Sequence, residues 1–185
     1  MGVKRKPIQT KLKPIKTNEM EVAISKLFGI RKHIIVPNVS WGLIGMHECD
    51  LFLIKSSGVA VEVEIKISRS DFLADFKKGH NHIDKHNRIT EFYYAFPKNI
   101  YEKCKEEIPE HAGIIICERY VNYKKIDMIS AQIKRSPKRI KGARKLTIEE
   151  QLKVARLGVM RIMTLKSKII TLQNKISDLN NNTKK

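Results

Sequence analysis

The chain has 185 residues, of which 42% are hydrophobic, so it is long enough to bury one ordinary core with appended tails. Its 37 lysines and arginines against 19 acidic residues give a formal net charge of +18, which favours polyanionic partners, nucleic acid first and an anionic membrane second. No apolar run approaches the roughly 18 residues of a membrane span and no secretory signal is evident, so we expect a soluble, cytoplasmic protein.

The first 17 residues are predicted to form a flexible basic arm. They contain six lysines or arginines, two prolines and no acid, so they bury too little apolar surface to fold alone. Such an arm could neutralise phosphates or only aid solubility, and the sequence leaves both open. The predicted core domain follows over residues 18–135.

Residues 18–29 predict the first helix, with Asn18 as its N-cap and Gly29 at its end. Glu21 lies three residues after Asn18 and has two interpretations. It either completes a capping box with Asn18 or joins a metal site further along the chain. A short apolar strand is predicted next, over residues 34–39.

The central segment of the sequence runs from His47 to Lys66 and reads HECDLFLIKSSGVAVEVEIK. Its two apolar runs, residues 49–55 and 59–67, are interrupted by Ser-Ser-Gly, which predicts a β-hairpin. Alternation along the second strand puts Glu62, Glu64 and Lys66 on one face. The hairpin can therefore bring Asp50 close to Glu64 and Lys66.

This cluster suits metal-assisted cleavage of a phosphodiester. Asp50 and Glu64 on adjacent strands offer the hard oxygen ligands that Mg²⁺ prefers, with Mn²⁺ as a substitute. A metal there would polarise a phosphoryl oxygen and activate a water, and the Lys66 ammonium would orient that water or stabilise developing charge. The alternative is a solvated face of an antiparallel sheet that carries cross-strand ion pairs.

Asp50, 13 intervening residues and then Glu64-Ile65-Lys66 resemble the motif of the PD-(D/E)XK nuclease superfamily. The continuation SRSDFLADFKKGHNHIDKHNRITEFYYAFP resembles its MmcB-like group of DNA-repair proteins, and the likeness covers roughly residues 18–118. It implies a restriction-endonuclease-like fold in which Asp50, Glu64 and the Ile65 carbonyl hold the metal. Lys66 completes the implied catalytic set, Glu21 and Glu48 support it, and Cys49 replaces a proline common in the family.

The following elements predict an α/β sandwich around a mixed sheet. A helix capped by Ser68 or Ser70 runs to residue 78, and its Asp71 is explained by the helix dipole. An aromatic strand (91–97), a helix (99–107), a buried strand (113–117) and an edge strand (123–133) complete the core. Three widely spaced cysteines are expected to be reduced thiols and not zinc ligands.

Two basic segments are candidates for contacts with DNA phosphates. The first contains Lys77, Lys78 and His80, and the second, which runs into a loop over residues 136–146, contains Arg135, Lys138, Arg139 and Lys141. A merely solvated loop is the alternative for the second. His82 and His86 are four residues apart, but without a third ligand they favour phosphate contacts over a metal pair.

The sequence Thr147-Ile148-Glu149-Glu150 is a capping box that opens a long amphipathic helix, predicted over residues 147–180. The helix is longer than a small core needs. We therefore expect its distal half to pack on a second copy, as a homodimer, or to fold back. Lys166 and Gln173, taken as seam positions, argue against a strong coiled coil.

These features together predict a Mg²⁺-dependent deoxyribonuclease, an endonuclease of DNA repair or recombination that recognises DNA structure more than base sequence. The alternative function is a DNA-binding module that keeps the fold without catalysis. Under that alternative the acidic residues are only surface charge.

Overall fold

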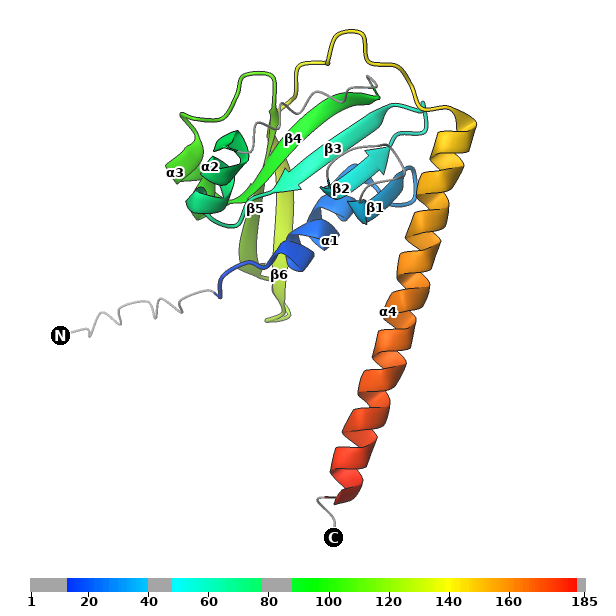
Figure 1. The fold of residues 1–185 in the computed structure, drawn as a ribbon. Helices are drawn as coiled ribbons and strands as arrows, with labels where there is room; N and C mark the ends of the chain where they lie inside the picture. The colour runs from blue at the N-terminus through cyan, green and yellow to red at the C-terminus, as the bar shows by residue number, and fades with distance from the viewer. Residues whose placement is uncertain (1–12, 40–47, 78–87, 183–185) are drawn as a thin grey trace, which may run out of the picture.

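The computed structural model describes residues 13–39, 48–77 and 88–182, with the side chains of residues 76, 77 and 182 excepted. In these ranges six strands form one open sheet in chain order (Figure 1). The strands are β1 (Ile34–Val39), β2 (Cys49–Ile54), β3 (Ala60–Ile65), β4 (Ile89–Pro97), β5 (Gly113–Val121) and β6 (Asp127–Arg135). β3, β4 and β5 pair in parallel and the other neighbours pair antiparallel, so the predicted mixed sheet is confirmed.

Helices cover both faces of this sheet. α1 (Thr17–Phe28) packs Met20 and Ile24 against one face, together with Val61 and Val63 of β3. α2 (Arg69–Lys77) and α3 (Lys98–Cys104) cover the other face, where Phe72 of α2 contacts aromatic rings of β4. The continuous apolar strands predicted from the sequence are therefore the central strands of an α/β sandwich.

The start of α1 differs from the sequence prediction. The N-cap is Lys16, whose backbone N–H donates to the Glu19 carboxylate at 2.8 Å, so Asn18 already lies inside the helix. Lys16 takes this place because Glu19, three residues later, supplies the acceptor that a capping box needs. Gly29 ends the helix with φ of +85°, as predicted, and Glu21 has no capping role.

The hairpin of β5 and β6 also lies later in the chain than predicted. β5 continues to Val121, and the Asn122 side-chain oxygen accepts hydrogen bonds from the backbone of Lys124 and Ile126, both at 2.9 Å. This side-chain turn places Tyr123 outside the strand and moves the start of the edge strand to Asp127.

The last helix, α4 (Ile148–Asn182), begins on the sheet and then leaves it (Figure 1). The predicted capping box is confirmed: Thr147 N–H donates to Glu150 at 2.8 Å, and Glu150 N–H donates to the Thr147 hydroxyl at 3.2 Å. Val154 is buried, and a Cβ on Gly158 would lie 3.2 Å from Val36, so this glycine allows α4 to approach β1 closely. In the described ranges, no helix is long and apolar enough to cross a membrane.

Candidate active site

The acidic cluster lies where β2 begins and β3 ends. The antiparallel pairing of Leu51 with Val63 makes Asp50 and Glu64 neighbours across the two strands. Asp50 Oδ2 accepts a 2.8 Å hydrogen bond from the backbone N–H of Ile65, which fixes its carboxylate at the end of the ladder. The predicted approach of Asp50 to Glu64 and Lys66 is thus present in the fold.

The charged face of β3 is buried. Glu62, Glu64 and Lys66 are 0%, 7% and 5% exposed. Glu62 and Glu64 pair with Phe92 and Tyr94 of β4, so β3 is an interior strand on this side. The alternative of a solvated antiparallel face is therefore wrong for these residues.

Lys66 is held between two carboxylates from different elements. Its Nζ lies 3.1 Å from Glu64 Oε2 and 2.7 Å from Asp75 Oδ2 of α2. Burial alone would lower the pKa of Lys66, but Glu64 and Asp75 outweigh burial, and the net pKa is raised. The side chain is therefore a fixed ammonium within the cluster.

The carboxyls of Glu64 and Asp50 are both shifted toward their neutral forms. Burial raises the pKa of Glu64 to about 7, helped by repulsion from Asp50 and Glu62 and opposed by Lys66. Burial also raises the pKa of Asp50, against the hydrogen bond from Ile65 and the charge of Lys66. An added cation would relieve both penalties, because it favours the ionised carboxylates.

The donor atoms present fit a hard divalent cation. Glu64 Oε1 is buried and accepts no hydrogen bond from the described residues, so this oxygen is available as a ligand. Within the described ranges, no group of three or more His, Cys, Asp or Glu side chains is arranged to hold a metal ion. Mg²⁺ does not need such a group, because it commonly keeps several waters and binds one or two carboxylates together with substrate phosphate.

Glu21 and Glu48, the two predicted supporting acids, differ in their placement. Burial and the nearby charge of Asp50 raise the pKa of Glu21, while the Asn38 side chain and Arg161 lower it. Glu21 therefore belongs to the same electrostatic cluster as Asp50. Glu48 is exposed, and no contact recorded for the described residues joins it to the others.

Sequence reasoning missed three members of this cluster. For Asp75 the only signal in the sequence is its spacing: Asp71 and Asp75 lie four residues apart on α2 and so share one helix face. The helix dipole is a sufficient explanation of Asp71 in the sequence, yet in the fold its charge acts on Asp50. Arg161 donates to the backbone oxygen of Asn38 and had no sequence signal, because only the fold brings α4 beside β1.

The predicted phosphate-binding loop lies at the opposite end of the sheet. Its Leu146 N–H donates to the Gly58 oxygen at 2.9 Å and its Ile140 N–H to the Thr90 oxygen at 3.0 Å. Gly58 comes just before β3, and Thr90 is the second residue of β4, so both acceptors lie where these strands begin. Glu64 lies near the other end of β3, six residues after Gly58, which is about 20 Å along an extended chain. The loop therefore does not border the carboxylates.

The predicted basic residues divide into anchored and exposed ones. Arg135 is half-buried and donates to the backbone oxygens of Ala112 at 3.0 Å and Pro109 at 2.6 Å, so it fastens β6 to the segment just before β5. Lys138 pairs with Glu110 at 2.8 Å, while Arg139 and Lys141 are exposed. Lys78, His80, His82 and His86 lie outside the described residues, as does the side chain of Lys77.

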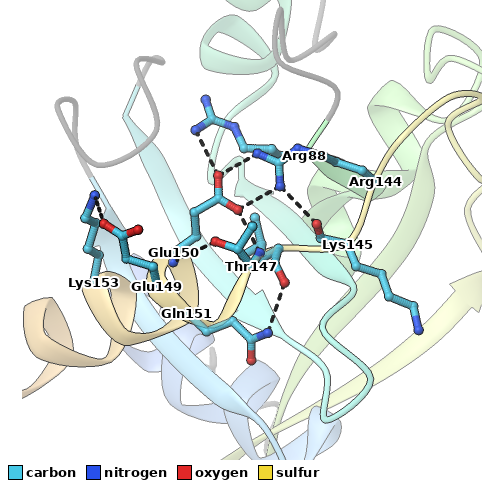
Figure 2. A network of polar contacts seen from close by, with 9 residues as sticks. Arg88, Arg144, Lys145, Thr147, Glu149, Glu150, Gln151 and Lys153 are labelled. Atoms are coloured by element: carbon cyan, nitrogen blue, oxygen red, sulfur yellow. Dashed lines mark hydrogen bonds and ion pairs between the residues drawn. The ribbon is translucent and has the colours of Figure 1, made fainter.

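A second polar network fixes the loop to the start of α4 (Figure 2). Glu150 accepts hydrogen bonds from Arg144 at 2.6 and 2.7 Å and from Thr147 N–H, and Arg88 lies 3.8 Å away. The Arg144 guanidinium, the Thr147 amide and the Arg88 charge lower the pKa of Glu150 to about 2. Groups of the chain itself therefore stabilise Glu150 as an anion.

Comparison with known proteins defines the fold but not an activity. No family model matches the chain, and no curated protein matches it. Among solved structures it is similar to the SPO1766 protein of unknown function from Silicibacter pomeroyi, with 16% sequence identity and a TM-score of 0.56. The match covers 88% of this chain and 95% of that one, so the two share an overall fold.

Proposed function

We propose that the chain is a metal-dependent DNA nuclease of the PD-(D/E)XK type. One observation carries the proposal: Asp50 and Glu64 stand side by side with raised pKa values, next to a buried and fixed Lys66. Burying three charged side chains on one strand is costly for stability, and such clusters are characteristic of functional sites. The mixed sheet with helices on both faces agrees with a restriction-endonuclease-like arrangement.

Each residue of the cluster has a role in this proposal. Asp50 and Glu64 would hold Mg²⁺ or Mn²⁺, with Glu21 adding negative charge beside Asp50. The metal supplies Lewis-acid polarisation of a phosphoryl oxygen and an acidified water. Lys66 would stabilise the charge that develops on the phosphate, and Asp75 would keep the Lys66 ammonium in place. Asp75 is a positioning residue, because it acts through Lys66.

DNA is the preferred substrate because of the charge of the whole chain. The net charge of +18 favours a polyanion and would offset the repulsion between phosphates and the acidic cluster. Arg139 and Lys141 are exposed and able to reach phosphates at a distance from the cluster. Nothing in the cluster suggests base readout, so recognition would depend on DNA structure.

The rival proposal is a DNA-binding module without catalysis. It is favoured by the inward direction of Lys66, whose ammonium is already engaged by Glu64 and Asp75. In that case the three groups form a buried ion network that selects one packing of α2 on the sheet. Lys66→Ala would then leave the DNA-binding strength unchanged, with no cleavage to lose.

Cleavage of a DNA panel separates the two proposals. The panel contains linear duplex, single strand, nicked circle and a four-way junction, each with Mg²⁺ or Mn²⁺ and with Asp50→Ala as the control. Metal-dependent products from the parent chain and none from the control are expected. Salt-sensitive binding of every substrate without any product would overturn the nuclease proposal in favour of the binding module.

A further inference from the structure

Arg161 of α4 lies on the same face of the sheet as the acidic cluster. Val36 of β1, Phe52 of β2 and Val154 of α4 belong to one hydrophobic cluster, so α4 packs on the face to which these strand residues point. Side chains alternate along a strand, so Asp50, two residues before Phe52, points to that face too. Arg161 follows Val154 by seven residues, about two helical turns, and therefore also faces the sheet.

The backbone of Asn38 holds Arg161 at the end of the sheet where the cluster lies. The antiparallel β1–β2 register pairs the residues on either side of Asn38 with those on either side of Asp50, and passes over these two. Asn38 has φ of +51°, in the left-handed region, which asparagine adopts more readily than most residues other than glycine. Its backbone oxygen accepts a hydrogen bond from Arg161 Nη2. The guanidinium is thus fixed beside the strand position opposite Asp50.

The Arg161 guanidinium has donors that the described part of the chain does not use. Arg161 is half-buried, and a guanidinium carries five N–H donors in one plane. Nε is buried and has no acceptor among the described residues. An acceptor from outside the described chain would remove the cost of leaving a buried donor unpaired.

Lys66 is not the cation that faces outward from the site. It is 5% exposed, and its ammonium is already engaged by Glu64 and Asp75. A phosphate that approaches Asp50 and Glu64 meets carboxylates, which repel it. Arg161 offers a positive charge on the same face, held in place by its hydrogen bond, to offset that repulsion.

We propose that Arg161 binds the backbone phosphate of DNA at the acidic cluster, so that the first half of α4 is part of the candidate active site. The inference rests on the proposed nuclease function for the identity of the ligand as a phosphodiester. A guanidinium suits this ligand because two of its N–H groups can donate to two phosphate oxygens at once. The hydrogen bond to Asn38 sets the direction in which the remaining donors point.

Binding of a short DNA duplex by the full chain in metal-free buffer, at several salt concentrations, tests this role. Arg161→Gln is expected to bind about tenfold more weakly than the parent. The salt slope, log binding constant against log salt, should fall by about 0.9, the contribution of one phosphate contact.

The matched control is Arg156→Gln, which removes the same charge from the same helix. Arg156 is exposed and lies two residues after Val154, a rotation of about 200°, so it points away from the sheet. Its loss should leave the affinity and the salt slope close to those of the parent. Losses as large in Arg156→Gln as in Arg161→Gln would overturn the proposal.

Arg161→Lys separates phosphate binding from a purely structural role. Lysine keeps the charge and a donor for the Asn38 oxygen but lacks the planar pair of donors, so its affinity should lie between those of Arg161→Gln and the parent. Urea denaturation of every variant measures the structural contribution. If Arg161→Gln loses stability but keeps the affinity and salt slope of the parent, Arg161 only fastens α4 to β1 and the proposal is wrong.

DNA cleavage with Mg²⁺ distinguishes failure of this inference from failure of the proposed function. If the parent cleaves DNA and Arg161→Gln binds and cleaves like Arg156→Gln, the role of Arg161 is wrong and the nuclease proposal stands. If the parent cleaves nothing but Arg161→Gln alone lowers the affinity and the salt slope, the phosphate site stands and the nuclease proposal is wrong. A parent that does not bind DNA overturns both.

Discussion

Two glutamates on opposite sides of the molecule show opposite electrostatics. Glu64, at the end of β3, has its pKa raised to about 7 by burial and by its acidic neighbours. Glu150, at the start of α4, has its pKa lowered to about 2 by Arg144, the Thr147 amide and Arg88. The ionised form of a glutamate is thus destabilised at the end of β3 and stabilised at the start of α4.

The difference separates a candidate reactive site from a structural one. The Glu150 network matches the negative charge of Glu150 with donors from the loop and the helix end (Figure 2). The Glu64 cluster gathers several acids around one ammonium and leaves Glu64 Oε1 without a donor among the described residues. Strongly shifted carboxyls gathered in this way are typical of candidate functional sites.

The largest expected effect is on catalysis at the Glu64 end. Lys66→Ala should reduce DNA cleavage by at least about a thousandfold, or about 4 kcal/mol of barrier, because no other ammonium of the described residues replaces it. Steady-state cleavage and a DNA-binding titration are measured in parallel, and binding should persist. The control is Lys55→Ala, which removes a lysine paired with Glu91 at 2.6 Å, away from the cluster. Equal losses of DNA cleavage in both variants would contradict a specific catalytic role for Lys66.

The next effect is on stability at the Glu150 end. Glu150→Ala removes the capping box and both Arg144 hydrogen bonds, and should lower the free energy of unfolding by about 2 kcal/mol. Its matched control is Glu149→Ala, one residue earlier, whose exposed pair with Lys153 contributes about 0.3 to 0.5 kcal/mol. Urea denaturation compares them, and a Glu150→Ala loss no greater than that of the control would be evidence against the structural role of the network.

Asp75→Asn should give a smaller change in catalysis than the loss of Lys66. Lys66 keeps Glu64, so we expect cleavage to fall by about tenfold, or about 1.4 kcal/mol. The loss of a carboxylate also lowers the pKa of Lys66, so the alkaline limb of the pH–rate profile should move to lower pH. A reduced rate with an unmoved profile would mean that Asp75 is only structural.

The smallest expected effects concern stability against pH, and they have opposite signs. The raised pKa of Glu64 means that its contribution is most favourable below pH 4.5 and is lost as pH rises through about 7. The lowered pKa of Glu150 gives stability above pH 4.5 that is lost as pH falls toward about 2. In metal-free buffer, Glu64→Gln should become progressively more stable relative to the parent as the pH rises from 4.5 to 8, because the parent then has to ionise a buried carboxyl. A constant difference over this range would contradict the shift.

Much of this molecule could be predicted from local sequence. The capping box at Thr147, the Gly29 stop, the hairpin with its Ser-Ser-Gly turn and the mixed character of the sheet followed from residue types and spacing. The sheet edge at Tyr123 and the cap at Asn18 were misplaced because side chains of Asn122 and Glu19 supply competing hydrogen bonds.

The candidate site was predictable only in part. Asp50, Glu64 and Lys66 lie within one hairpin, so alternation and register were enough to bring them together. Asp75 and Arg161 come from α2 and α4, and their approach depends on how those helices pack. The burial of the charged strand face was equally invisible, because alternating charge predicts a solvated face unless the neighbouring strand is known.

Binding of Mn²⁺, followed by its electron paramagnetic resonance signal, tests the central claim most directly. The parent chain is titrated beside Asp50→Asn, which removes a charge but retains an acceptor for the Ile65 N–H, and beside Glu149→Gln as a control for lost surface charge. We predict one binding site in the parent and in Glu149→Gln, with at least tenfold weaker binding in Asp50→Asn. Equal binding by all three proteins, or none by the parent, would contradict a metal site at Asp50 and Glu64.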